Sequence, residues 1–221
     1  MLNFSVSEEN YIKAIFRLQH GDNTVTTNEL SAELRAKPAS ITDMMKKLRT
    51  KKLVHYEAYK GFRLTAEGRK AGLMIIRRHR LWEFFLSEKL KFTWDEVHEL
   101  AEELEHVSSK KLIDKLDEFL GFPRYDPHGD PIPDANGKIE ASRQVALTAL
   151  PLNKSATVCH VSDQSSSMLE LLGHKKIAIG TRVELKKQFD FDGSMDVRVG
   201  RQQTVNISKQ LAQNIYVKYD G

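Results

Sequence analysis

The sequence predicts a mainly α-helical chain with some β-structure, organised as an N-terminal winged helix-turn-helix, a middle helical domain and a small C-terminal β-barrel. Three observations predict this organisation. Short helical patterns and a hairpin pattern fill the first 65 residues, longer helical patterns occupy residues 66–120, and short strand patterns follow residue 156. A chain of 221 residues is long enough for two or three domains that each bury a core.

Two bulk properties limit the classes of function. The chain has neither a signal-peptide pattern nor an apolar run long enough to span a bilayer, so we expect a cytoplasmic protein. Cys159 is the single cysteine, which excludes an intramolecular disulfide and any multi-cysteine zinc or iron–sulfur site. If the chain binds a metal, the ligands must be mainly nitrogen and oxygen atoms.

Positive charge is concentrated in the N-terminal third of the chain. Residues 1–80 carry 16 Lys/Arg and 8 Asp/Glu, although the net charge of the whole chain is only +4. The remainder is therefore slightly acidic. This asymmetry favours a polyanion as the partner of the N-terminal third alone.

The helical part of the predicted winged helix has three segments. The first helix is expected to have Ser7 as its N-cap and to end at His20-Gly21-Asp22-Asn23. Its apolar positions are Tyr11, Ala14, Ile15 and Leu18. Thr27 would cap a short second helix, and Arg35-Ala36-Lys37-Pro38 forms a tight turn with proline in a first-turn position. The third helix buries Ile41, Met44, Met45 and Leu48.

Small polar residues begin this third helix, which is typical of a recognition helix that enters the major groove of DNA. A β-hairpin over residues 53–57 and 62–64, with its turn at Tyr59-Lys60-Gly61, would form the wing, and Thr65 would cap the next helix. Basic side chains of the third helix and the wing would contact phosphates. The expected DNA-binding residues are Thr27, Pro38, Ala39, Ser40, Thr42, Asp43, Lys46, Lys47, Arg49, Lys60 and Arg63.

Asp43 is discordant in this set, because a carboxylate repels phosphates unless it accepts a hydrogen bond from a cytosine amino group. The alternative interpretation of the first 65 residues is a three-helix protein-interaction domain with a hairpin. The cluster of basic side chains favours DNA.

The next two predicted helices carry acidic and imidazole side chains at helical spacing. A helix over residues 66–90 has an apolar stripe that includes Ile75, Ile76, Leu86 and Leu90. His79 and Glu83 project along the same stripe, four residues apart. Several such groups packed together are costly to bury unless the carboxylates are paired or coordinated, and a divalent cation would remove that cost.

The following segment, WDEVHELAEELEHV (residues 94–107), is expected to bury Leu100, Leu104 and Val107. At about 100° per residue, a different group of residues gathers on the opposite side. This group comprises His98, Glu102, Glu105 and His106. Taken alone, it is equally consistent with an ordinary solvated polar face.

At this point the chain resembles the diphtheria toxin repressor and manganese transport regulator family of metal-dependent repressors. The resemblance covers nearly the whole length. It rests on the segments GFRLTAEGRKAG, RRHRLWEFFL, EELEHVSS and PRYDPHGDPIPDANG, followed by a β-rich C-terminal module. The PHGDPIP stretch is a specific marker of the family with no obvious chemistry of its own.

The resemblance implies two neighbouring cation sites. The primary site would use Asn10, Glu102, Glu105 and His106, and the second would use His79, Glu83 and His98. In manganese-type members His79 instead joins the Glu102 group. Iron-type members have a cysteine at position 102 and a methionine on the first helix, so the oxygen donors of this chain favour Mn²⁺, with Fe²⁺ close behind. Manganese-type members have Asp and Glu where this chain has Asn10 and Lys13.

The C-terminal third completes the expected organisation. The resemblance implies that an amphipathic helix over residues 112–120 joins a dimer interface, whereas ordinary core packing is the alternative. An ordered loop covers residues 123–137. We predict strands at residues 157–161, 182–188, 195–199, 204–207 and 215–219, and helices at 167–172 and 209–213, in a small barrel like the family's SH3-like module. His160 or Asp163 of this module could lend a ligand to the second site.

The expected domains are a winged helix at residues 1–72, a metal-binding and dimerisation domain at 73–140, a linker at 141–155 and an SH3-like, FeoA-like domain at 156–221. The resemblance implies a homodimeric, metal-activated repressor of metal-uptake genes that binds a palindromic operator. A metal-dependent hydrolase is the rival class. Against it, the sequence has no His-Glu-x-x-His motif and no Gly-rich phosphate loop. A winged helix that binds a partner without metal is a further alternative.

Overall fold

The computed structural model describes residues 4–19, 21, 23–57, 60–107, 109–139, 144–200 and 203–219. The chain divides into two compact units, which are described separately. The first unit comprises residues 1–79, 104–114 and 133–138, and the second comprises residues 80–103, 115–132 and 139–221. None of the described helices is long and apolar enough to cross a membrane.

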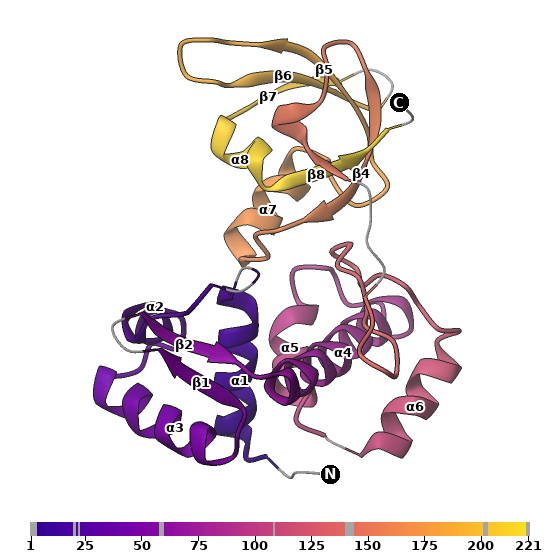
Figure 1. Cartoon of the computed structure of the whole chain (residues 1–221). Helices are drawn as coiled ribbons and strands as arrows, with labels where there is room; N and C mark the ends of the chain where they lie inside the picture. Colours follow the sequence, from indigo (N-terminus) through magenta and orange to yellow (C-terminus); the bar gives the residue numbers. More distant parts are fainter. Residues whose placement is uncertain are drawn as a thin grey trace. The chain divides into compact units, whose positions relative to one another are not determined.

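The first unit begins with three helices around a hydrophobic core, and Figure 1 draws these helices in indigo to purple. They are α1 (Val6–Leu18), α2 (Thr27–Glu33) and α3 (Pro38–Thr50). The N-caps predicted for α1 and α2 are wrong by one or two residues. Ser5, not Ser7, caps α1 in a reciprocal capping box with Glu8, and Thr26, not Thr27, caps α2 in the same way with Glu29. Each acidic partner stands three residues after its cap, so the glutamates select the cap position.

The predicted wing is confirmed as an antiparallel hairpin of β1 (Val54–Glu57) and β2 (Gly61–Leu64). Tyr59, predicted in its turn, lies outside the described residues, as do His20 and Asp22 at the expected end of the first helix. Gly61 has φ +126°, and a Cβ there would lie 2.3 Å from the carbonyl oxygen of Val25. A side chain at position 61 would therefore separate the wing from the helices.

Helix α4 (Ala66–Glu88) follows the wing, and Thr65 caps it as predicted, because its Oγ1 accepts a hydrogen bond from Gly68 N at 3.0 Å. His79 and Glu83 are buried on this helix, also as predicted. Leu90 was assigned to the same apolar stripe, but it lies beyond the end of α4 and is 54% exposed.

Two shorter helices follow, α5 (Val97–Leu104) and α6 (Lys110–Phe119). The predicted buried side of the 94–107 segment is wrong. Val97 and Ala101 are buried, whereas Val107 is 41% exposed. Glu105, expected on the opposite side, is completely buried. In α6, Ile113 and Leu116 are buried, but Leu112 and Phe119 are exposed and apolar.

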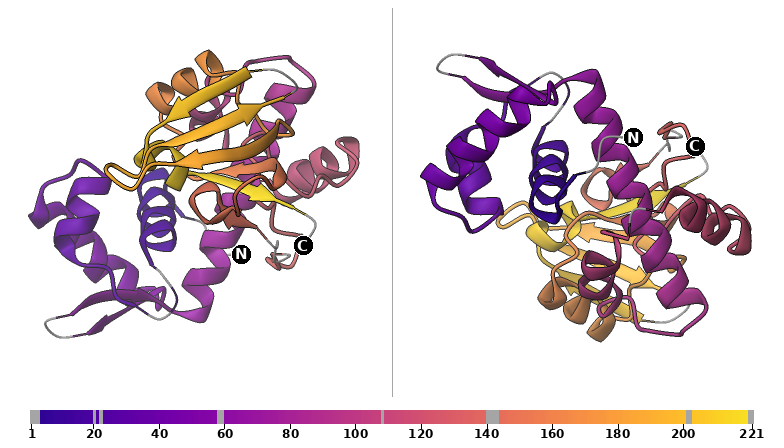
Figure 2. Two further views of the ribbon diagram at one scale, coloured as in Figure 1. Left: turned by 90° about the horizontal axis from the view of Figure 1, so that it is seen from above. Right: turned by 90° about the horizontal axis from the view of Figure 1, so that it is seen from below.

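The second unit contains a six-stranded antiparallel sheet with strand order β3-β8-β4-β5-β6-β7. Strands of this sheet appear in orange to yellow in both views of Figure 2. Its strands are β3 (Val145–Ala146), β4 (Ser155–Val161), β5 (Arg182–Gln188), β6 (Met195–Val199), β7 (Gln203–Ile207) and β8 (Ile215–Lys218). Helices α7 (Ser166–His174) and α8 (Lys209–Gln213) enclose its core. The strands and helices predicted after residue 156 are thus confirmed to within a few residues.

Part of the segment predicted as a linker belongs to this fold. Val145 and Ala146 pair with β8, and the 3-10 turn Leu147–Ala149 follows directly. Leu147 and Leu150 are buried in the core of the sheet. The two-residue strand is too short to produce a period-2 pattern in the sequence.

Candidate metal centre and nucleic-acid interface

The first unit buries a group of charged and imidazole side chains between α1, α4 and the end of α5. We refer to it as the first acid cluster, and its members are Glu9, Lys13, Arg78, His79, Glu105 and His106. Sequence periodicity placed Glu105 and His106 on a polar face, but Glu105 is completely buried. His79 is buried, as its position on the apolar stripe predicted.

Glu105 is central in this cluster and fully buried. Its Oε1 lies 2.6 Å from Lys13 Nζ, and its Oε2 lies 2.8 Å from His79 Nδ1. Burial opposes the negative charge, but the hydrogen bond from His79 and the charge of Lys13 outweigh it and lower the pKa of Glu105. Glu105 is therefore held as a carboxylate, the form that binds a cation.

Glu9 orients the other imidazole of the cluster. Its Oε2 lies 2.7 Å from His106 Nδ1, and its Oε1 accepts a hydrogen bond from Arg78 Nη2 at 2.5 Å. A neutral His106 that donates from Nδ1 keeps its lone pair on Nε2, which lies 3.8 Å from Glu105 Oε1. A carboxylate behind a histidine is how metal-binding imidazoles are usually fixed. Glu9 was not among the ligands predicted from the sequence, although it stands beside Asn10.

Asn10 supplies an independent sign that the cluster fits a cation. Its Oδ1 is buried and has no hydrogen-bond partner among the described residues. A buried acceptor without a partner is costly, and a bound cation would satisfy it. The donors of this cluster are carboxylate, imidazole and amide groups, which suit Mn²⁺ or Fe²⁺ better than a soft ion.

The second unit holds another group of acidic side chains, which we call the second acid cluster. It is formed by Arg80, Glu83, His98, Asp126, His128 and Asp130. Ligand atoms of Glu83, Asp126 and His128 lie within 4.8 Å of one another, and all three residues are buried. These three side chains could hold a metal ion.

His128 is oriented for this role. Its Nε2 lies 2.7 Å from the carbonyl oxygen of Trp94, which assigns the proton of a neutral ring to Nε2. The lone pair is then on Nδ1, which lies 3.8 Å from Glu83 Oε1. Burial raises the pKa of Asp126 well above its usual value, and the nearby charges of Glu83 and Asp130 raise it further. Within the cluster as defined, the three carboxyl groups of Glu83, Asp126 and Asp130 face one arginine, Arg80.

Asp126 and His128 were missed as candidate ligands, because PHGDPIP had been assigned no chemistry. They lie in a loop, where no periodicity marks the buried face. The only signal in the sequence was an aspartate and a histidine two residues apart within an otherwise proline-rich stretch.

The loop that carries these residues is fastened to strand β4. Gly129 has φ +84°, and a Cβ there would lie 1.9 Å from the carbonyl oxygen of Cys159. Val161 N donates to the carbonyl oxygen of His128 at 3.0 Å. His160, predicted as a possible ligand, has Nε2 3.5 Å from Asp130 Oδ1. Asp163, the other residue suggested for this role, instead accepts a hydrogen bond from Ser165 N at 3.0 Å and is exposed.

The predicted ligands are divided between the two units. Asn10, His79, Glu105 and His106 lie in the first unit. Glu83, His98 and Glu102 lie in the second. There, His98 Nδ1 lies 3.1 Å from Glu83 Oε1, and His98 Nε2 lies 3.5 Å from Glu102 Oε1.

The predicted DNA-binding residues lie on α3, at the start of α2 and on the wing. Those of α3 are all exposed, namely Pro38, Ala39, Ser40, Thr42, Asp43, Lys46, Lys47 and Arg49. Lys60 is exposed, whereas Thr27 and Arg63 are half-buried. Asp43 is paired with Lys46 at 3.0 Å, which gives this carboxylate a partner within the helix.

The recognition helix is also connected to α1. The buried carboxylate of Glu8 lies 2.7 Å from Lys51 Nζ and 3.3 Å from Lys47 Nζ. Burial opposes the charge of Glu8, but Lys51, the Ser5 backbone N–H and Lys47 lower its pKa to about 2. The adjacent residues Glu8 and Glu9 therefore join α1 to α3 on one side and to the first acid cluster on the other.

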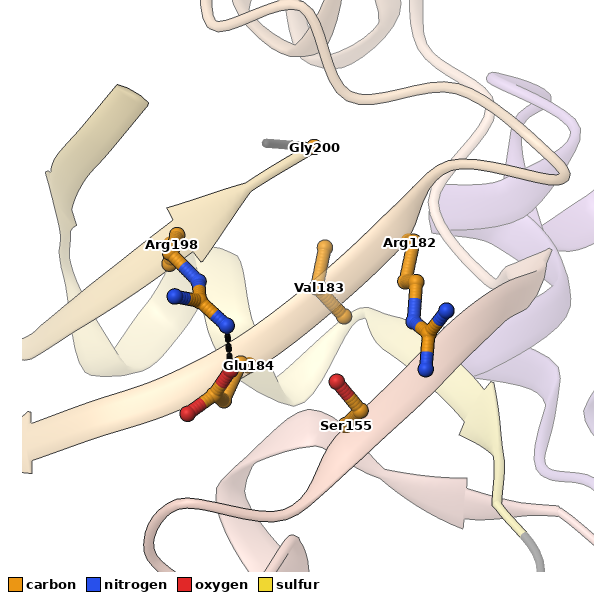
Figure 3. Close-up of a pocket in the computed structure, with 6 residues that line it drawn as sticks. All are labelled: Ser155, Arg182, Val183, Glu184, Arg198 and Gly200. Atoms are coloured by element: carbon orange, nitrogen blue, oxygen red, sulfur yellow. Dashed lines mark hydrogen bonds and ion pairs between the residues drawn. The ribbon is translucent and has the colours of Figure 1, made fainter. Parts of the chain in front are cut away.

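A separate hollow of about 240 Å³ lies on the sheet of the second unit (Figure 3). It is lined by Ser155, Arg182, Val183, Glu184, Arg198 and Gly200. Glu184 pairs with Arg198 inside it and with Lys186. None of the predicted ligands lines this hollow, so it is distinct from both acid clusters.

Comparison with known proteins agrees with this arrangement. The family profile described as "Iron dependent repressor, N-terminal DNA binding domain" matches residues 3–62. "Iron dependent repressor, metal binding and dimerisation domain" matches residues 65–134, and "FeoA domain" matches residues 145–219.

Related proteins have matching descriptions. The HTH-type transcriptional regulator MntR of Oceanobacillus iheyensis is 31% identical over 116 residues, which are 52% of this chain and 78% of that protein. The iron-dependent repressor IdeR of Mycobacterium leprae is 23% identical over 95% of this chain and 96% of its own length. A probable metal transport system membrane protein of Chlamydia trachomatis is 43% identical over 75 residues, and the chain spans only 17% of its length.

Among solved structures, a manganese-dependent transcriptional repressor in complex with manganese has a TM-score of 0.86 and 33% identity, and the match covers 96% of this chain and 99% of that one. The manganese regulator SloR has a TM-score of 0.78 and 27% identity, with 96% and 98% of the two chains covered. A winged helix with a basic recognition helix, followed by helices with buried carboxylates and imidazoles, defines the class of metal-dependent DNA-binding regulators. Within that class, this chain belongs to the iron-dependent repressor family.

Proposed function

We propose that this chain is a cytoplasmic, homodimeric transcriptional repressor that binds a palindromic operator of metal-uptake genes when Mn²⁺ is plentiful. DNA binding would reside in residues 1–72, and metal binding and dimerisation in residues 73–140. It acts as a regulator and not as an enzyme. An iron-responsive repressor is the alternative within the same family.

The observation that carries this proposal is the first acid cluster, because two of its residues, Glu9 and Lys13, lie on α1, the first helix of the proposed DNA-binding region. In the proposed primary site Asn10, Glu102, Glu105 and His106 bind the metal, with His79 as a further ligand. The second site uses Glu83 with His98, and Asp126 and His128 extend the set proposed from the sequence. Buried carboxylates and an orphaned amide oxygen support a hard divalent cation in preference to a soft one.

The proposed mechanism is linkage between metal and operator binding. Asn10, Glu102, Glu105 and His106 would hold the ion, which would supply a positive charge shared by these ligands. Asn10 is on α1, and Glu8 of the same helix holds Lys47 and Lys51 of α3. Fixing α1 therefore fixes the recognition helix, and two such helices in a dimer fit one operator spacing. A coupling of about 1–3 kcal/mol is the usual scale for such an effect.

Oxygen donors also favour manganese over iron at the primary site. Glu102 stands where iron-type relatives have a cysteine, and the single cysteine, Cys159, lies on β4 with its Sγ close to Gln144 and Tyr216. A site without sulfur loses much of its preference for the softer, later metals of the first transition row.

The test is selection of duplexes from a random DNA library by the full chain, with Mn²⁺ or with chelator. We expect enrichment of a palindrome with Mn²⁺ alone, and weaker enrichment with Fe²⁺ under anaerobic conditions. Glu102→Gln should lose Mn²⁺-dependent binding to the selected duplex. Glu103→Gln, which removes the same charge from an exposed position of α5, should retain it. Equal binding with and without metal, or equal loss in both variants, would contradict the proposal.

A further inference from the structure

The first acid cluster contains a buried lysine whose role is not explained by metal ligation. Lys13 on α1 is only 4% exposed, and its ammonium lies 2.6 Å from Glu105 Oε1. An ammonium group has only donors and no lone pair, so it cannot bind a metal. Lysine is rarely buried without a charged partner, and here the partner is a proposed metal ligand.

Each buried carboxylate of the cluster has a cationic partner. Its buried carboxylates, Glu9 and Glu105, face two cationic side chains, Arg78 and Lys13. Both oxygens of Glu105 are engaged, Oε1 by Lys13 and Oε2 by His79. A divalent ion that binds Glu105 must therefore share an oxygen with one of these two groups or displace it.

His79 and Lys13 differ in how they respond to such an ion. The imidazole can remain and become a ligand itself. The ammonium group would lie within a few ångströms of the metal on a shared oxygen, where two cations in a buried site repel each other strongly. Lys13 is therefore the group that must move.

We propose that Lys13 is an internal cation that occupies Glu105 in the metal-free protein and competes with the activating metal for it. This inference rests on the proposed function of the cluster as the primary metal site. Lys13 raises the metal concentration at which the regulator responds. It also protects Glu105 from being buried without a counter-charge when metal is scarce.

The competition between Lys13 and the metal also changes which group links α1 to the rest of the cluster. Without metal, the Lys13–Glu105 pair joins α1 to the segment after α5, and with metal the ion joins them through Asn10. The regulator thus exchanges one link for another at the same helix. Metal binding accordingly has to break an ion pair before it can add its own.

The experiment compares the Mn²⁺ affinity of Lys13→Met with wild type by isothermal titration of the metal-free full chain. The binding event to follow is the one that Glu102→Gln removes. We expect Lys13→Met to bind Mn²⁺ at least about tenfold more tightly, because the competing charge is gone. Arg17→Met is the matched control. It removes a positive charge one turn further along α1 from an exposed position, and its affinity should stay within about twofold of wild type.

A second readout is the stability of the metal-free protein to urea. Lys13→Met should lower the midpoint in chelator, because the buried Glu105 loses its counter-charge, and added Mn²⁺ should restore more stability than it does in wild type. If Lys13→Met does not fold without metal, Lys13→Gln retains a hydrogen-bond donor to Glu105 without the charge and should show the same increase in affinity.

The possible outcomes distinguish a failure of the role proposed for Lys13 from a failure of the proposed primary site. Tight Mn²⁺ binding by wild type with unchanged affinity in both Lys13 variants would overturn the role of Lys13 and leave the proposed function intact. Absence of any Mn²⁺ binding event that depends on Glu102 would overturn the proposed primary site. Equal tightening by Lys13→Met and Arg17→Met would reduce the effect to net charge and overturn the competition.

Discussion

The two acid clusters differ in how the negative charge of their buried carboxylates is balanced. In the first cluster each buried carboxylate has a cationic partner, Lys13 for Glu105 and Arg78 for Glu9. In the second, Arg80 is shared between Asp126 and Asp130, and the pKa of Asp126 is raised by burial, by Glu83 and by Asp130. In the first cluster each buried carboxylate is paired with a cation without an added ion, whereas in the second the carboxyl groups outnumber the arginine. A metal would replace a cation in one and relieve repulsion in the other.

Removing a carboxylate should therefore have opposite effects in the two clusters, and the largest effect is expected in the first. Glu105→Gln leaves the Lys13 ammonium buried without its counter-charge. We expect the free energy of unfolding of the metal-free protein to fall by about 3–5 kcal/mol, the usual cost of breaking a buried ion pair from one side. Urea denaturation in chelator at neutral pH measures it. A loss below about 1 kcal/mol would show that Lys13 reaches solvent easily.

Glu8 of α1 forms ion pairs with Lys47 and Lys51 in the first unit. Its lowered pKa makes the free energy of unfolding depend on pH. Its folded pKa of about 2 is below the ordinary value of 4.5, so its pairing stabilises the fold fully above pH 4.5 and is lost as the pH falls towards 2. We expect the free energy of unfolding to decrease by about 1.4 kcal/mol between pH 6 and pH 3.5 through this group alone. Glu8→Gln should remove that part of the pH dependence. Identical slopes for the variant and wild type would show that Glu8 is not paired in solution.

In the second cluster the corresponding substitution should stabilise the metal-free protein. Asp126→Asn keeps an oxygen for the N–H groups of His128 and Asp130, which it accepts at 2.9 Å each, and removes the repelling charge. We expect the free energy of unfolding in chelator to rise by about 1 kcal/mol, while the additional stability conferred by Mn²⁺ decreases. Destabilisation of the size expected for Glu105→Gln would remove the distinction between the clusters.

The smallest expected effect is on DNA binding by the wing, which should not depend on either acid cluster. Lys60→Ala, at the wing, should lower the slope of log operator affinity against log salt by about 1 if Lys60 contacts one phosphate. Mn²⁺ affinity should not change, because Lys60 pairs weakly with Glu57 at 3.7 Å and with neither cluster. The selected duplex, titrated between low and moderate salt, provides the measurement. An altered Mn²⁺ affinity would mean that the wing and the metal sites are coupled directly.

The sequence was sufficient for the winged helix because each of its elements produces its own local signal. Pro38 begins α3, Thr65 caps α4 and alternating residues form the wing. The caps of α1 and α2 were misplaced because each helix start offers two candidate caps close together, Ser5 and Ser7 for α1 and Thr26 and Thr27 for α2. The capping box resolves the choice, since Glu8 and Glu29 each lie three residues after the true cap.

The chemistry of the clusters was less accessible from periodicity. Glu105 lies on the polar side of a pattern set by Leu100 and Leu104, and only the partners Lys13 and His79 make its burial acceptable. Those partners are distant in sequence, 92 and 26 residues away. Asp126 and His128 stand in a loop, where no repeating pattern exists to mark the inward side.

Gly129 has a consequence for how the domains of this regulator can be inherited or recombined. The loop with Asp126 and His128 lies so close to β4 that no side chain fits at position 129, and the carbonyl oxygen of His128 is bonded by Val161. Strand β4 of the C-terminal module therefore holds in place the loop that carries Asp126 and His128. A protein shortened after residue 139 would lose these contacts, so gain or loss of this module in evolution changes the second acid cluster at the same time.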